Sequence, residues 1–250
     1  MKYLNTMSLI GFIGSVSSRS FLVSAFIPSA LNTFRARTLS STCTTKTMTS
    51  LKSAPVEKVD PVEEVDPDHV DGTDLRVLKY PHPALRAPNV EITEEELASG
   101  EFTKIAKEMF LVMYATSGVG LAAPQVGINK KLMVYNQSGD KTKWLEEVIM
   151  VNPKIVAYSD AISLEQEGCL SFPGMNGDVE RSKWIKVEAQ KLNGKKMKKK
   201  FIGWEARIFQ HEYDHLDGIV YPDRLEGEEK ELVKGRLGEL VKEFGEGGSL

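Results

Sequence analysis

The sequence has few cysteines, few histidines and no long apolar run, and each shortage excludes a class of protein. Its 250 residues include two cysteines, Cys43 and Cys169, and four histidines. Two cysteines cannot form a scaffold of several disulfides, and they suit a reducing compartment. No window holds the roughly 18 uninterrupted apolar residues that a membrane-spanning helix requires, so we expect no membrane span.

An excess of positive charge is also missing. The chain has 32 Lys and Arg against 35 Asp and Glu, a net charge of -3. No overall field attracts it to nucleic acid, and we expect no DNA partner. The composition, 41% hydrophobic and 27% charged, is typical of one globular domain with an appendage.

Acidic residues are absent from residues 1–56, which hold nineteen Ser and Thr. This composition is typical of an organelle-targeting leader. The apolar run at residues 9–13 and the junction Ser24-Ala25-Phe26 resemble a two-part leader that enters the secretory route and then a plastid. We therefore predict a plastid protein, with the mitochondrion as the alternative; a plain disordered tail is the simplest other interpretation.

The composition reverses at residues 57–73, which are rich in Asp and Glu and predict an acidic disordered linker. Residues 74–250 are long enough for one catalytic domain. Apolar or alternating runs predict strands at residues 75–78, 132–135, 148–151, 154–158, 162–165 and 185–189. Helices are expected from a capping box at Thr93 to the break at Gly118, at residues 205–216, and up to Gly245. The fold class is α+β with antiparallel sheets.

The pentapeptide at residues 211–215 places His211 and His215 one helical turn apart on one face, with Glu212 beside them. This is a two-ligand metal platform, or else a surface helix. Cys169, between glycine and a Pro-Gly turn, is the candidate third ligand; otherwise it is a small buried thiol. His69 and His82 are less attractive ligands.

A Cys-His-His set permits ferrous iron as well as zinc and leaves a position for water. Glu212 is then a general base, which predicts hydrolysis of an amide or similar bond. Residues 118–127 offer exposed backbone and Gln125 as donors for an oxyanion. Because no Gly-Lys-Ser/Thr follows, this segment is not a phosphate loop; a plain structural loop is the other interpretation.

Residues 118–127, 167–171 and 210–218 together resemble the three signature motifs of the peptide deformylase family, closest to its plastid branch. The resemblance covers roughly residues 74–224. It implies antiparallel sheets packed around a central metal-binding helix, and a hydrolase that removes the formyl group from N-formylmethionine of nascent polypeptides and releases formate. It also implies one divalent metal ion, Fe2+ by preference, for which Zn2+, Ni2+ or Co2+ can substitute.

The resemblance assigns roles to individual residues. Cys169, His211 and His215 match the metal ligands, and Glu212 matches the general base. The donors that hold the formyl oxygen match Gln125 and the Leu170 backbone N–H. The substrate edge and the methionine pocket are carried by Gly120, Val119, Trp204, Ile208 and His211. Trp204 departs from the smaller residues usual there, so it either narrows the pocket mouth or packs on the helix start.

The cationic cluster at residues 195–200 suggests a transient ribosome contact through RNA. We favour a solvated hairpin tip, since charge runs usually lie on exposed faces. The basic face of the last helix, with Lys234, Arg236 and Lys242, is a rival ribosome contact, although simple packing explains that helix.

Three other functions compete with the deformylase. A peptidase would complete the histidine pair with Glu226, Glu228 or Glu229. A cysteine nucleophile with a histidine base would need no metal. A structural metal module would need a fourth protein ligand, and none is evident.

Overall fold

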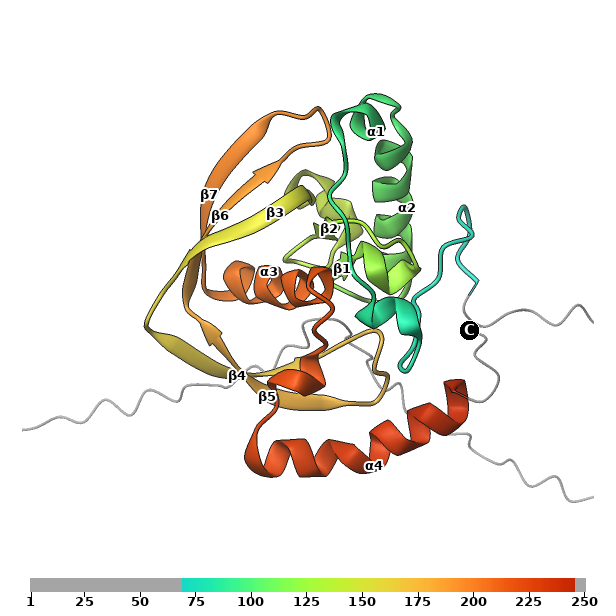
Figure 1. Cartoon of the computed structure of the whole chain (residues 1–250), viewed down its shortest axis with the longest axis vertical. Coiled ribbons are helices and arrows are strands. Elements are labelled where there is room, and N and C mark those ends of the chain that lie inside the picture. The colour runs from blue at the N-terminus through green and yellow to red at the C-terminus, as the bar shows by residue number, and fades with distance from the viewer. Residues whose placement is uncertain (1–68, 246–250) are drawn as a thin grey trace, which may run out of the picture.

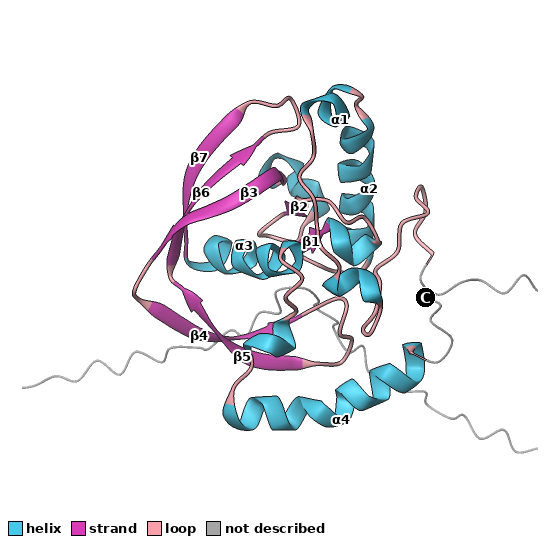
Figure 2. Ribbon diagram, viewed as in Figure 1, coloured by secondary structure: helices cyan, strands magenta, loops and turns pink. Residues whose placement is uncertain are grey.

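A computed structural model describes residues 69–245, so the predicted leader, residues 57–68 of the predicted linker and Cys43 lie outside the described residues. The described chain has the predicted α+β fold, with two antiparallel sheets around one helix and a further helix at the C-terminal end (Figures 1 and 2). Its helices are α1 (Glu94–Ala98), α2 (Glu101–Ala115), α3 (Gly203–Leu216) and α4 (Gly227–Phe244). Its strands are β1 (Gly120–Ala122), β2 (Leu132–Tyr135), β3 (Val148–Tyr158), β4 (Ile162–Gly168), β5 (Asn176–Ser182), β6 (Trp184–Gln190) and β7 (Lys196–Ile202).

The larger sheet has the strand order β1-β2-β3-β6-β7, and the smaller sheet pairs β4 with β5. Every pairing is antiparallel. β1 is therefore an edge strand, with β2 on one side only. Figure 1 shows α3 enclosed between the larger sheet and the β4–β5 pair, with α4 beyond that pair.

Helix α3 is buried on nearly all sides, which places its polar residues inside the protein. Its apolar residues Ile208 and Phe209 are fully buried against the larger sheet, where Ile185 and Phe201 belong to the same cluster. The rings of Phe209 and Phe201 stack with centroids 5.1 Å apart. Because so much apolar surface is buried around it, the helix is a rigid platform for a functional site.

The prediction of one helix from Thr93 to Gly118 is wrong. Thr93 does cap a helix, since its hydroxyl accepts from Glu96 N–H and its own N–H donates to the Glu96 carboxylate, but this helix is the short α1. Gly100 then adopts φ 79°, which ends the α-helical path, and α2 begins at Glu101. The apolar stripe of α2 packs in the core with β1 and β2, as its periodicity indicated.

Two strand predictions are also corrected. Residues 75–78 form no strand, because their backbone makes isolated hydrogen bonds instead of a ladder: Leu78 N–H donates to the Gln125 carbonyl at 2.7 Å, and Leu75 N–H donates to the Thr73 hydroxyl at 3.0 Å. Residues 148–151 and 154–158 belong to one strand, β3. Asn152, with φ 48°, lies at a register shift that lets β3 continue past the irregularity.

Helix α4 is amphipathic and covers the outer side of the smaller sheet. Val233 and Leu240 are buried in a cluster with Phe172 and Tyr221, and α4 contacts β5. This packing is the role that its apolar stripe predicted. Within residues 69–245, none of the helices combines the length and the apolarity needed to cross a bilayer.

Candidate metal centre

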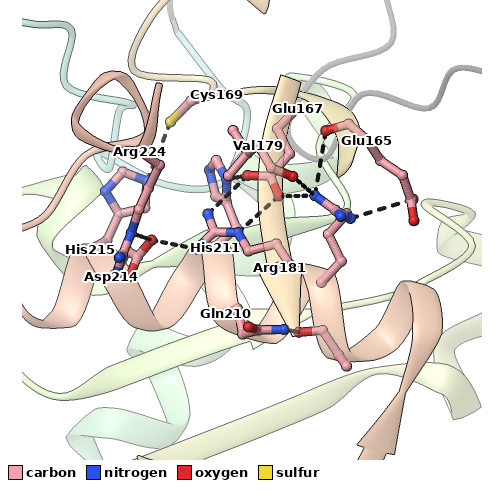
Figure 3. Close-up of polar contacts among 12 residues, drawn as sticks. Glu165, Glu167, Cys169, Val179, Arg181, Gln210, His211, Asp214, His215 and Arg224 are labelled. Atoms are coloured by element: carbon pink, nitrogen blue, oxygen red, sulfur yellow. Dashed lines mark hydrogen bonds and ion pairs between the residues drawn. The ribbon is translucent and has the colours of Figure 1, made fainter. Parts of the chain in front are cut away.

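Cys169, His211 and His215 come together in the interior. One ligand atom from each residue lies within 4.8 Å of the other two. The Cys169 Sγ is 3.3 Å from His215 Nε2, and the two imidazole rings have centroids 5.3 Å apart. Figure 3 shows the thiol on the side of α3 from which both histidines project. The structure thus brings together the three residues that the sequence motifs singled out.

The β4–β5 hairpin positions the thiol. β4 ends at Gly168, which pairs with Asn176 of β5. The chain then turns, with Phe172 N–H donating to the Cys169 carbonyl at 2.9 Å. Cys169 is buried at this turn, so its side chain faces α3 and not solvent.

The three side chains fit a divalent metal ion. His211 Nε2 is buried without a hydrogen-bond partner among the described residues, an arrangement that costs free energy unless a ligand compensates, and His215 Nε2 faces the thiol of Cys169. Burial lowers the pKa of His215 well below its usual range, whereas hydrogen bonds and charge from Cys169 and Glu167 outweigh burial at His211 and raise its pKa well above the usual range. No fourth His, Cys, Asp or Glu within residues 69–245 joins the cluster. Three protein ligands with one position free are typical of catalytic sites.

Glu167 orients His211 from behind. Its Oε2 lies 2.9 Å from His211 Nδ1, so an Nδ1–H donates there and Nε2 is left facing Cys169 and His215. The same carboxylate accepts two bonds from Arg181, both 2.9 Å, and one from Arg207 at 2.7 Å. Burial alone raises the pKa of Glu167, but Arg181 and His211 outweigh it and hold the pKa below its usual range.

The carboxylate network continues along α3 to Asp214. Arg181 donates to Asp214 Oδ2 at 2.6 Å, and Arg224 donates to the same oxygen at 3.0 Å (Figure 3). Arg207 adds bonds to the Val179 carbonyl and to Ser163 of the β4–β5 pair. Two buried carboxylates therefore face two buried guanidinium groups, and the network ties α3 to the smaller sheet.

Glu212 is buried on the same helix, and neither of its carboxylate oxygens has a hydrogen-bond partner among the described residues. Burial raises the pKa of Glu212 to about 7. A Cβ added at Gly120 would overlap this carboxyl group, so β1 approaches it closely enough to require glycine. The structure thus places an unpartnered carboxyl group beside the edge strand.

Gln125 lies directly after β1, in the 3-10 helix η2 (Ala123–Val126), and is fully buried. Its Oε1 accepts from Ala122 N–H at 2.8 Å, which fixes the orientation of the amide. Its Nε2 then faces the metal centre, 3.6 Å from Cys169 Sγ and 3.4 Å from Ser171 Oγ. Leu170 follows the thiol, and its carbonyl accepts from Lys79 at 3.2 Å. Both residues expected to supply the oxyanion donors therefore lie next to Cys169, and their donation to a substrate stays a prediction.

Three of the residues expected to wall a methionine pocket, Val119, Trp204 and Ile208, lie in or against one apolar cluster. Ile208 is fully buried, whereas Val119 and Trp204 are partly buried against it. The Trp204 indole N–H donates to the Gln137 carbonyl at 3.0 Å, which anchors the ring beside the loop after β2. Their contact with substrate stays a prediction.

Sequence reasoning missed the residues behind the ligands. Glu167 lies within one of the three motifs, but the resemblance assigns it no role, and it assigns none to Arg181, Arg207 or Asp214. A signal was present for two of them: Arg207 and Asp214 are charged residues close to the apolar Ile208, Phe209 and Leu216 on a helix expected to be buried, and buried charges need partners.

The comparisons with known proteins agree with this site. The family model described as polypeptide deformylase matches residues 74–231. Peptide deformylase 1B, chloroplastic, of Solanum lycopersicum is 41% identical over 170 residues, which cover 68% of this chain and 60% of the relative. Peptide deformylase 1B, chloroplastic, of Oryza sativa is 45% identical over 174 residues, which cover 69% and 62%. The chain therefore spans less than two thirds of the length of these curated relatives.

The solved structures match over nearly their whole length. A plant peptide deformylase PDF1B crystal structure is 40% identical, with a TM-score of 0.66 over 70% of this chain and 92% of that one. The peptide deformylase of Plasmodium falciparum is 38% identical, with a TM-score of 0.65 over 70% of this chain and 100% of that one. With the family model covering more than half of the residues, the chain belongs to the polypeptide deformylase family.

Proposed function

We propose that the protein is a peptide deformylase, which hydrolyses the formyl group from N-formylmethionine of nascent organelle-encoded polypeptides and releases formate. The observation that carries this proposal is the convergence of Cys169, His211 and His215 beside the unpartnered carboxyl group of Glu212. Family membership supports the same reaction.

Cys169, His211 and His215 would hold the divalent ion, which when bound would supply a Lewis acid and acidify a water. Glu212 accepts a proton from the attacking water and passes it to the departing amine, so that formate and a free amino terminus result. Gln125 Nε2 and the Leu170 backbone N–H donate to the oxygen of the formyl group as negative charge develops there. The hydrogen bond from Ala122 N–H to Gln125 Oε1, 2.8 Å long, keeps the Nε2 end of that amide directed at the site.

The substrate peptide pairs with the free edge of β1 at Val119 and Gly120, as a strand added to the sheet. Its methionine side chain lies among Val119, Trp204 and Ile208, whose apolar surfaces suit a thioether. The bond from the Trp204 indole to the Gln137 carbonyl supports a role for this ring in narrowing the mouth of the pocket, and packing on the start of α3 is the alternative.

We propose Fe2+ as the native ion, with Zn2+, Ni2+ or Co2+ as substitutes, because the thiolate lowers the net charge of the site and favours softer ions. Metal analysis of protein purified without oxygen tests this choice. Zinc in stoichiometric amount under those conditions would contradict it.

The plastid is the proposed location, and the mitochondrion is the alternative. Residues 1–56 have the composition of a leader, and the tomato and rice relatives are named chloroplastic. A relative from Arabidopsis thaliana is named chloroplastic/mitochondrial. Fluorescence of residues 1–56 fused to a reporter should appear in plastids; a purely mitochondrial signal would contradict the assignment. Since nascent chains are presented by ribosomes, transient contact with the ribosome is part of the proposed function.

The decisive test is formate release from a short formyl-methionyl peptide by the metal-loaded protein. We expect turnover that a chelator abolishes, with no cleavage of internal peptide bonds. Chelator-insensitive turnover would favour a cysteine nucleophile, and internal cleavage would favour a peptidase. The structure already weakens the peptidase, because Glu226, Glu228 and Glu229 lie at the exposed start of α4 and none joins the Cys-His-His cluster.

A further inference from the structure

The β6–β7 hairpin is far more basic than the rest of the protein. Residues 184–202 contain seven lysines and one glutamate, although the whole chain has a net charge of -3. Positive charge is thus concentrated in one hairpin, which is the local field that binding of a polyanion requires.

Strand pairing places most of this charge on one face. On β6, Ile185 and Val187 are buried, so Trp184, Lys186 and Glu188 point to the opposite face. The register joins these residues to partners on β7: Trp184 to Ile202, Lys186 to Lys200, Glu188 to Lys198 and Gln190 to Lys196. We call the face formed by these residues the outer face.

The outer face carries lysines without carboxylate partners. Lys198 is paired with Glu188 at 2.6 Å, but Lys186 and Lys200 have no carboxylate partner among residues 69–245. They are directly opposed across the two strands, an arrangement of like charges that destabilises a sheet. Their ammonium groups lie over the ring of Trp184, at 5.9 and 4.3 Å from its centroid. An anion between the two lysines would relieve their repulsion.

The outer face is open and separate from the metal centre. Figure 2 shows α3 on the inner side of β6 and β7, and none of the helices within residues 69–245 lies on the other side. Lys186, Lys196 and Lys200 are all exposed. A partner bound there would lie on the other side of the sheet from α3 and would not cover the Cys-His-His site.

We propose that the outer face binds the phosphate backbone of RNA. The row of lysines along two extended strands suits a linear polyanion better than a single small anion, because it offers several contacts along one direction. The choice of RNA over other polyanions rests on the proposed function, since a deformylase meets its substrates where ribosomes present them. Contacts to phosphates carry no sequence information, so binding is independent of sequence.

The test compares two doubly substituted full-length chains that lose the same charge. Lys186→Gln with Lys200→Gln removes the unpaired lysines of the outer face, and Lys104→Gln with Lys107→Gln removes exposed lysines of α2. Affinity for a short labelled single-stranded RNA of mixed sequence is measured by fluorescence anisotropy over a series of salt concentrations. The parent and both variants keep residues 1–68, so any binding of RNA by these residues is the same in all three proteins.

Each phosphate contact contributes about 0.7 to the slope of log affinity against log salt on a single strand. We therefore expect the outer-face variant to lose about 1.4 of that slope and the α2 variant to keep the parent slope. Equal slopes in the two variants, no RNA binding by the parent, or tighter binding of the parent to anionic vesicles than to RNA would overturn the proposal. Formate release from a short peptide should be unchanged in both variants, which shows that they fold. RNA binding is measured without turnover, so a failed deformylase assay of the parent would leave this result standing.

Discussion

Replacing Glu167 by glutamine removes the charge at the centre of the buried network while keeping the shape of the side chain. The carboxylate accepts two bonds from Arg181 and one from Arg207 and orients His211, and all four side chains are almost completely buried. Breaking a buried ion pair on one side costs about 3–5 kcal/mol, because the partner charge is left uncompensated. We expect the free energy of unfolding to fall by this amount, which lowers Tm by about 6–20 °C for a domain of this size.

The same substitution should weaken metal binding. Glu167 fixes the tautomer of His211, and loss of such a support typically lowers metal affinity by about 10–100-fold. Urea denaturation of the metal-free protein isolates the effect on stability. Competition for Zn2+ with a chromogenic chelator then measures the effect on metal binding.

Glu165 provides a matched control two residues earlier on the same strand. Its carboxylate is 3.4 Å from Arg207 Nε, but its side chain is 55% exposed. Glu165→Gln should change the free energy of unfolding by less than about 1 kcal/mol, as exposed ion pairs do. If Glu167→Gln and Glu165→Gln unfold at the same urea concentration and bind Zn2+ equally, the role assigned to the buried network is refuted.

Three further substitutions test the centre itself. Glu212→Ala should keep the metal and lower kcat by about 10²–10⁴-fold, because the proton carrier is lost while the ligands remain; parental rates of formate release would exclude Glu212 from that role. Cys169→Ser should weaken metal retention, since an alcohol is a poor replacement for a thiolate; unchanged metal content after dialysis would remove Cys169 from the ligand set. Gly120→Ala should place a methyl group against Glu212. We expect it to lower kcat and to lower the free energy of unfolding by about 1–3 kcal/mol. Gly235→Ala, where an added Cβ meets no atom, should instead stabilise α4 by about 0.5–1 kcal/mol, and equal urea midpoints for the two alanine variants would contradict the close approach of β1.

The candidate ligands were predictable because their signal is local. His211 and His215 are spaced by one helical turn, so their common face follows from helix geometry alone. Cys169 precedes His211 by 42 residues. It is the only cysteine outside the predicted leader, so no other thiol competed for the role of third ligand. The structure brings the thiol within 3.3 Å of His215.

The network behind the ligands was not predictable in the same way. Arg181 is 14 residues from Glu167 and 33 residues from Asp214 along the chain. Its hydrogen bonds to these two carboxylates therefore depend on how β5 passes α3. No periodic pattern specifies such pairs. The buried charges in α3 indicate only that partners must exist, not which residues they are.

The strands also divide into those that a local pattern predicts and those that it does not. β2 and β6 have buried or alternating apolar residues, and both were predicted. β7 has the sequence KMKKKFI, in which only one residue is buried, so no alternation marks it as a strand. β1 has three residues, and its pairing with β2 defines it more than its composition does. Residues 75–78 are the opposite case, a strand that was predicted and does not form. Their apolar run has no neighbouring strand to pair with, so it is a loop.

The location of the buried network explains how α3 tolerates a costly side chain. A buried carboxyl group without hydrogen bonds destabilises the fold, and Glu212 is such a group. The helix that carries it is held on another face by Asp214 and Arg207, which bond to the smaller sheet and to Arg181. Because the network contains equal numbers of buried carboxylates and buried guanidinium groups, it adds rigidity without net charge next to the metal ligands. The unpartnered carboxyl group can therefore remain poised at the edge of β1, where relaxation toward solvent would remove it from the site.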